Sequence, residues 1–223
     1  MTSSPPGTLD NCPPLSGSEG AYRVAGMAIV RPNSVLPDAN IWCSATLHSW
    51  FGLIAAETIG SWTFHWTEDI LAEAVYHRRK RFPMASAHQI DAVRDRLMHT
   101  MGEHRISGFA IDDSVTYPDK FDAHVHSAAV HEGIAIIVSD DRTGFVDLYP
   151  HPDDCPYEVH TADEFLTLVA DSTPQVVDAV ITAQLTYWTN KGRSFSLPDK
   201  LRQAQAPNFA EHVRARLQSM PLP

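Results

Sequence analysis

The sequence of 223 residues is poor in cysteine and has no long apolar run. Its three cysteines are too few and too scattered for a disulfide framework, and no two have the spacing of a metal-binding pair. Even the apolar stretch at residues 128–138 is interrupted by polar residues, well short of the roughly 18 residues that a membrane helix needs. The sequence therefore predicts a protein of a reducing compartment without a membrane span.

Basic residues are also scarce, because the formal net charge is -10 at pH 7. A protein that coats nucleic acid non-specifically needs an excess of lysine and arginine to neutralise phosphates, so the net charge argues against this class. One local basic segment remains at residues 77–81, with the sequence HRRKR. It is either a patch that contacts nucleic acid or simply a solvated helix face.

The first 26 residues are rich in proline, glycine and serine and show no hydrophobic periodicity. They have neither the basic start nor the apolar core of a secretory signal, so we expect a cytoplasmic protein with a flexible leader. Met27, where the composition changes, is an alternative natural start. We expect a globular domain at residues 27–170 and a helical extension at residues 171–223.

Strand and helix patterns alternate in this domain. Apolar runs predict strands at residues 27–36, 106–111, 134–138, 145–148 and 157–160. Capping signals and helical spacing predict helices at residues 44–59, 67–81, 86–101, 119–133, 161–170, 174–190 and from about 209. This alternation indicates a three-layer α/β fold in which helices flank a central parallel sheet.

Acidic residues follow the predicted strands at the edge where such sheets bind ligands. Asp38 comes after the first strand, and Asp140 and Asp141 come directly after the strand at 134–138. Asp119 and Asp122 lie near the start of the helix that leads into that strand. We therefore expect four or five carboxylates to converge at one edge of the sheet.

Clustered carboxylates repel one another unless a cation neutralises them, which points to a divalent metal ion. A site made of oxygen ligands selects Mg²⁺ or Mn²⁺ over Zn²⁺. Such ions activate water for attack on phosphorus, so the pattern favours phosphodiester hydrolysis.

Each candidate also has a purely structural interpretation. Asp119 and Asp122 could serve only as helix caps, Asp38 could start a turn, and Glu73 could be a surface residue of an amphipathic helix. His124 and His126 are two residues apart on a helix and cannot face one ligand, so we assign them no metal. We expect the tryptophans at positions 50, 62 and 66 to belong to the core.

The order of these motifs resembles the PIN-domain family, specifically the VapC-like toxin ribonucleases. The resemblance covers residues 27–170. It rests on the following segments: LPDAN at 36–40, ILAE at 70–73 preceded by Trp66, residues 119–125, and IIVSDD at 136–141 followed by Phe145.

The resemblance implies an Mg²⁺- or Mn²⁺-dependent endoribonuclease that acts on RNA. The residues expected to act in catalysis and to bind the metal are Asp38, Glu73, Asp122 and Asp141, with Asp119 as an additional metal ligand and Ser139 and Asn40 in support. We expect the RNA backbone to contact Arg78, Arg79 and Lys80. Because these toxins commonly dimerise and are held inactive by an antitoxin, the resemblance also implies an antitoxin partner and a homodimer.

Three positions depart from the family pattern. Pro37 replaces an apolar residue before the first acid, Ala123 stands where arginine is common, and Gly144 stands where an acid often precedes the phenylalanine. None of these changes removes a metal ligand, although the loss of the arginine would weaken RNA positioning.

Two rival interpretations stay open. A degenerate PIN-like domain could act as a binding module through a protein partner. A phosphate-transferring receiver or a haloacid-dehalogenase-like phosphatase would need a lysine after a late strand, or a second aspartate two residues after the nucleophile. This chain has Asn40 at the latter position and no lysine within residues 134–150.

Overall fold

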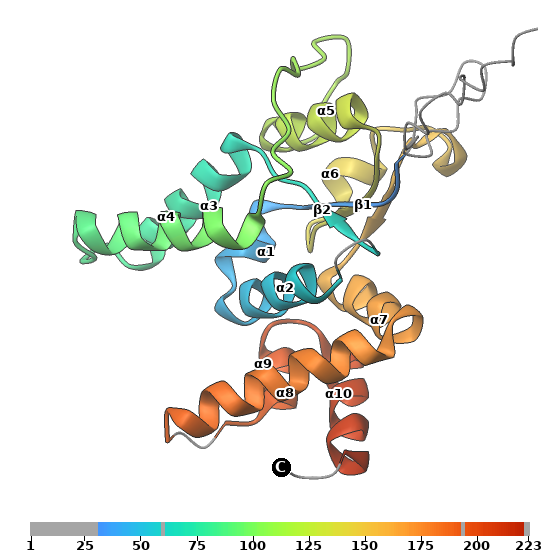
Figure 1. Ribbon diagram of the computed structural model, residues 1–223. Helices are drawn as coiled ribbons and strands as arrows, with labels where there is room; N and C mark the ends of the chain where they lie inside the picture. Colours follow the sequence, from blue (N-terminus) through green and yellow to red (C-terminus); the bar gives the residue numbers. More distant parts are fainter. Residues whose placement is uncertain (1–30, 59–60, 193–194, 221–223) are drawn as a thin grey trace, which may run out of the picture.

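A computed structural model of the protein describes residues 31–58, 61–192 and 195–220 (Figure 1). The expected leader at residues 1–26, the alternative start at Met27 and the first residues of the predicted strand at 27–36 lie outside the described residues.

The centre of the fold is a four-stranded parallel sheet with the order β2-β1-β3-β4. Its strands are β1 (Arg31–Pro37), β2 (Thr63–Phe64), β3 (Ile134–Val138) and β4 (Glu158–His160). β1 and β3 lie in the middle of the sheet, and for β3 this is the place expected from its apolar run. They pair in the register Leu36 to Ile137 and Pro37 to Val138, so both strands end at the same level.

The α-helices account for most of the remaining chain. They are α1 (Ala39–Cys43), α2 (Ala45–Glu57), α3 (Glu68–Arg81), α4 (Ala87–Met101), α5 (Ala123–Glu132), α6 (Thr143–Val146), α7 (Ala162–Ser172), α8 (Pro174–Asn190), α9 (Leu197–Gln203) and α10 (Pro207–Ser219). Two short 3₁₀ helices, η1 (Lys120–Asp122) and η2 (Pro152–Asp154), complete the described elements.

The helices cover both faces of the sheet, which confirms the expected three-layer α/β fold. Figure 1 shows α5 on one side of the sheet and α2 and α7 on the other, with α8, α9 and α10 beyond them. α3 and α4 form a hairpin that projects beside α1. None of the helices in the described ranges is long and apolar enough to cross a membrane.

Aromatic rings join the sheet-covering helices to the C-terminal helices in one core. Phe51 of α2 stacks on Phe165 of α7 with 5.5 Å between ring centroids. Trp50, the residue just before Phe51 on α2, meets Phe209 of α10 edge to face at 5.0 Å. The C-terminal helices thus share the hydrophobic core of residues 31–172. α7 itself runs to Ser172, so the boundary expected at residue 170 falls inside a helix.

Most predicted helix starts are confirmed, although the helix expected from Asp119 divides into η1 and α5, and the last helix begins at Pro207 and not near residue 209. The side chain of Thr67 caps α3, and Ser86 and Thr161 each form a reciprocal capping box with the residue three positions later. Pro174 opens α8. Gly133 ends α5 in the left-handed conformation that glycine adopts most readily.

Two predicted strands are wrong. Residues 106–111 form a loop. Ile106 is buried and donates its backbone N–H to the carbonyl of Trp66, but Ile111 at the other end of the segment is exposed to solvent. Residues 145–148 continue the single turn of α6, because Val146 donates to the carbonyl of Arg142 as in a helix. An apolar pair this short fits one helical turn as well as a strand. The sequence patterns also missed β2 and α9.

A buried carboxylate fixes α10 against α7. Asp163 of α7 accepts hydrogen bonds from the backbone N–H of Phe209 at 2.8 Å and of Asn208 at 3.2 Å, and from the Asn208 amide at 2.8 Å. Both backbone groups lie in the first turn of α10, which has no cap of its own from a neighbouring side chain. Asp163 is therefore a helix cap supplied by another helix, at the favourable end of the α10 dipole.

We expect Asp163→Ala to lower the free energy of unfolding by about 1–3 kcal/mol, because it leaves buried N–H donors of α10 without an acceptor. Chemical denaturation measures this loss. Asp171→Ala is the matched control, since Asp171 is an exposed carboxylate of the same helix. Equal stability of the two variants would contradict the capping role.

Candidate active site

Asp38 leaves the sheet at the carboxyl end of β1 and is only 8% exposed. Its backbone N–H donates to Val138 at the end of β3, which ties the two central strands together at 2.9 Å. Its side chain caps α1, with Oδ1 accepting from the N–H of Ala39 at 2.6 Å. Asp38 therefore has the structural role of a cap, while its second oxygen faces neighbouring polar groups.

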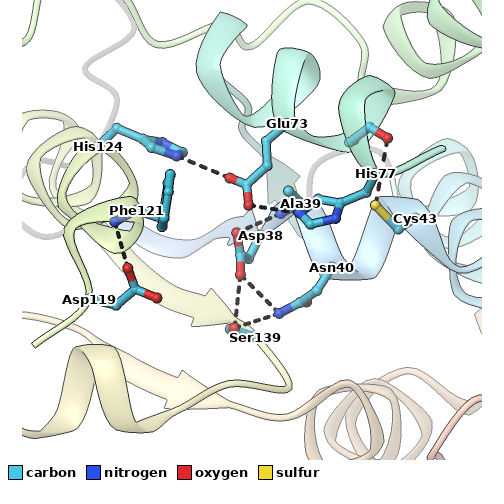
Figure 2. A network of polar contacts seen from close by, with 11 residues as sticks. Asp38, Ala39, Asn40, Cys43, Glu73, His77, Asp119, Phe121, His124 and Ser139 are labelled. Carbon is cyan, nitrogen blue, oxygen red and sulfur yellow. Dashed lines mark hydrogen bonds and ion pairs between the residues drawn. The ribbon is translucent and has the colours of Figure 1, made fainter. Parts of the chain in front are cut away.

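Asn40 and Ser139 hold that second oxygen of Asp38 (Figure 2). The Ser139 hydroxyl donates to Oδ2 at 3.0 Å, and the Asn40 amide donates to the same atom at 2.9 Å. The Ser139 oxygen also accepts from the Asn40 amide at 2.9 Å and from the N–H of Asp141 at 3.2 Å. These two side chains, expected in support of Asp38, do fix its orientation.

Glu73 projects from α3 between two histidines. One carboxylate oxygen lies 3.3 Å from Nε2 of His77, and the other lies 3.3 Å from Nε2 of His124 on α5. The hydrogen bond from His124 is the main cause that lowers the pKa of Glu73. His126 points elsewhere and bonds to the buried hydroxyl of Tyr157 at 2.6 Å. His124 and His126 thus face different surroundings, as their spacing of two residues on the helix predicts.

Asp119 and Asp122 flank the one-turn helix η1. Asp119 caps η1, because its carboxylate accepts a hydrogen bond from the N–H of Phe121 at 2.8 Å. The interpretation of Asp119 as a helix cap is therefore correct. Asp122 turns toward the start of α6, where Gly144 makes room for it. A Cβ atom on Gly144 would lie 1.6 Å from Oδ2 of Asp122, so any larger residue would displace the carboxylate. The absence of a larger residue at position 144 therefore has a local reason.

The two aspartates after β3 separate. Asp141 is exposed, and its Oδ1 accepts from the hydroxyl of Thr143 at 2.9 Å. Asp140 accepts from the N–H of Ala162 at 3.1 Å and so serves the start of α7. Of this pair, only Asp141 faces the other acids.

A single cavity of about 970 Å³ brings the acids and part of the basic segment together. Its walls come from α1, α3, η1, the start of α5 and the loop after β3. The acids that line it are Asp38, Asp69, Glu73, Asp119, Asp122 and Asp141. The bases that line it are His77, Arg78, Lys80, Arg81 and His124.

The cavity differs from the sequence prediction at a few positions. Arg79 does not line it, although Arg78 and Lys80 do. His77 and Arg81, which belong to the basic segment at 77–81 but were not named as RNA contacts, also line it. Asp69, His124 and the aromatic residues Tyr76 and Phe121 were not expected there. The spacing on α3 was a usable signal for His77 and Tyr76, because residues three and four positions after Glu73 share its face.

A second cavity of about 1020 Å³ lies between α2, α4 and α8. It is slightly larger, but its walls contain no aspartate and one glutamate, Glu103. The clustered acids, not the size of the cavity, identify the candidate site.

Burial and the neighbouring negative charges both disfavour an ionised carboxylate at the centre of the acidic cavity. Burial, followed by the charges of Asp38, Asp119, Asp141 and Glu73, raises the pKa of Asp122 to about 7. Burial also raises the pKa of Asp38, against the lowering effect of its hydrogen bonds from Ala39 and Ser139. A cation in the cavity would relieve this repulsion.

The residues at the cavity have the right ligand atoms for a hard divalent cation, but their side chains are too far apart to bind it as they stand. All the expected ligands offer oxygen atoms, which Mg²⁺ and Mn²⁺ prefer. Oδ1 of Asn40 is buried and has no hydrogen-bond partner among residues 31–58, 61–192 and 195–220. However, across these same residues no three His, Cys, Asp or Glu side chains form a group that could hold a metal ion as they stand. A cation would have to draw the carboxylates together.

Comparisons with known proteins do not identify a relative. No protein-family model, no curated protein and no solved structure matches this chain.

The raised pKa of Asp122 predicts a pH-dependent stability of the metal-free protein. The folded state holds a proton that the unfolded state releases, so stability falls as pH rises from about 4 to about 7. Asp122→Asn cannot ionise and removes this loss. In EDTA, we expect the variant to gain thermal stability over the parent protein at about pH 8 and less at about pH 5.

The control for this measurement is Asp91→Asn, which neutralises an exposed acid on α4 outside the cavity. A gain from Asp122→Asn that is the same at both pH values would contradict the electrostatic explanation.

Gly144→Ala should mimic the loss of Asp122, because the new methyl group occupies the place of its carboxylate. We expect the variant to fold, since the displaced group is the end of a partly buried side chain, and to lose the pH-dependent penalty described above. Thermal unfolding in EDTA measures this. Gly52→Ala, which meets Thr100 on α4 instead, is the control glycine outside the acidic cavity.

Proposed function

We propose that this protein is a metal-dependent endoribonuclease of the PIN-domain type, and that it is the toxin of a toxin–antitoxin pair. One observation carries the proposal: carboxylates from four separate elements line one cavity at the carboxyl end of the parallel sheet, together with cationic side chains of α3. Acids alone would suit a cation, and bases alone would suit an anion. Their combination suits a cation and a phosphodiester together.

The proposed metal ligands are Asp38, Glu73, Asp122 and Asp141, with Asp119 as an additional acid. When bound, Mg²⁺ or Mn²⁺ supplies positive charge for the phosphate oxygens and lowers the pKa of a water molecule for attack on phosphorus. Ser139 and Asn40 keep Asp38 oriented toward the cavity. His77 and His124 hold the Glu73 carboxylate on the wall of the cavity, where it would serve as a metal ligand.

The basic side of the cavity would carry the RNA backbone. Lys80 and Arg81 follow Glu73 by about two turns of α3 and line the same cavity, and neither is paired with a carboxylate in the described part of the chain. Unpaired cations at the mouth of an acidic cavity reduce the repulsion that a phosphate would meet there. Arg78 contributes from the same wall.

The second candidate function is a PIN-like binding module that acts through a protein partner. The observation that favours it is the spacing of the acids, since no three metal-binding side chains are grouped among the described residues. A module of this kind would bind no Mg²⁺ or Mn²⁺ at micromolar to millimolar concentrations and would cut no RNA. Calorimetric titration with each ion distinguishes the two candidates.

As a toxin, the protein would bind a cognate antitoxin and form a homodimer. These two expectations rest on the resemblance of its motif order to that of VapC-like toxins. Co-expression with the product of the neighbouring reading frame would test the antitoxin, and light scattering of the purified protein would test the dimer.

We expect the purified protein to cut RNA with Mg²⁺ or Mn²⁺ and not with EDTA. Asp38→Asn and Asp122→Asn should each reduce the cleavage rate by more than about a hundredfold, because changes even one shell beyond a metal ligand cost about ten- to a hundredfold. A panel of labelled RNAs measures the rate. Asp91→Asn controls for the loss of one negative charge outside the cavity.

Full activity of either cavity variant, or cleavage that persists in EDTA, would reject the proposed site. No cleavage of any RNA under any condition would favour the binding module.

A further inference from the structure

Two large aromatic side chains stand in solvent at the wall of the acidic cavity. Phe121 is 75% exposed and Tyr76 is 61% exposed. They come from different elements, η1 and α3, yet both line the cavity that holds the acids. A single exposed ring is common on protein surfaces, but here two large rings from separate elements line the same cavity, which offers flat apolar surface to a ligand held there.

The position of Phe121 follows from the turn on which it lies. Asp119 holds the N–H of Phe121, and the next residue, Asp122, turns inward toward Gly144. Figure 2 shows the Phe121 ring projecting from η1 on the side of Glu73 and His124. The same turn therefore directs one residue to the candidate metal site and its neighbour to the cavity wall.

Tyr76 shares the cavity face of α3 with both an acid and a base. It lies three residues after Glu73 and four residues before Lys80, and these spacings place all three side chains on one side of the helix. All three line the cavity. An aromatic ring with a cation one turn away matches the two parts of a nucleotide, which are a flat base and a charged phosphate.

From these placements we propose that Phe121 and Tyr76 stack on unpaired bases of the RNA substrate at the mouth of the cavity, while Lys80 and Arg81 bind the neighbouring phosphates. This inference rests on the proposed function and adds the residues that select an unpaired strand. Stacking requires a free base face, which a duplex does not offer. The contacts would be sequence-tolerant, because every base has such a face.

The test measures binding and not cleavage. A fluorescein-labelled single-stranded RNA of about ten nucleotides is titrated with protein in EDTA, beside a duplex of the same sequence and a strand of the same length that keeps every phosphate but lacks bases. We expect the single strand to bind most tightly. Phe121→Ala and Tyr76→Ala should each weaken its binding about tenfold and leave binding of the base-free strand unchanged.

Matched variants separate stacking from a loss of folding. Phe121→Trp and Tyr76→Phe keep an aromatic ring and should keep the affinity of the parent protein. Tyr187→Ala removes a ring that is 53% exposed on α8 and lines the other large cavity, so it should have no effect. Because the rings of Phe121 and Tyr76 are mostly in solvent, thermal unfolding of both alanine variants should match that of the parent protein.

The inference is overturned if the alanine variants bind the single strand as tightly as the parent protein does. It is also overturned if they lose affinity for the base-free strand to the same extent, or if the protein binds no RNA, in which case the exposed rings would fit a protein partner better. Failure of the proposed function looks different, since the protein would then bind RNA through these rings and still cut none with Mg²⁺ or Mn²⁺.

Discussion

The pairing of β1 with β3 is the constraint on which the candidate site depends. Parallel strands in register end at the same level, and here Pro37 pairs with Val138. The next residues, Asp38 and Ser139, therefore leave the sheet side by side and can share a hydrogen bond, although they are about a hundred residues apart in the sequence. A shift of one residue in this register would reverse the face of every side chain on one strand and separate the two groups.

The other acids near Asp38 and Ser139 are positioned by helices whose places are set by their own caps and packing. α3 starts at its Thr67 cap and packs its apolar side, which leaves Glu73 at the border of the buried face. η1 starts at its Asp119 cap, which sends Asp122 inward. The result is a cluster of negative charge that the folded chain stabilises only in part, as the raised pKa of Asp122 shows. A cation bound among these carboxylates, alone or together with a phosphate, would remove the repulsion between them.

The C-terminal helices contribute to this arrangement from a distance. α8 and α10 pack on α2 and α7, the two helices that cover one face of the sheet, through ring contacts such as Trp50 with Phe209. Asp163 of α7 fixes the first turn of α10. None of these residues reaches the acidic cavity. Their effect is indirect, because they pack against the helices that cover the sheet from which β1 and β3 direct Asp38 and Ser139 to the site.

The sequence by itself determined the parallel α/β architecture, the starts of the main helices and the edge of the sheet where Asp38 and Asp141 would emerge. These are local properties, since apolar runs, capping boxes and turn residues act over a few positions. It failed at residues 106–111 and 145–148, where short apolar pairs fit a loop or a helical turn as well as a strand. Only the tertiary structure decided that Asp140 turns to α7 while Asp141 faces the cavity, that His124 meets Glu73, and that Gly144 admits Asp122. These contacts join residues far apart in the chain, and their geometry is set by the packing of helices against the sheet, for which a single sequence carries no periodic signal.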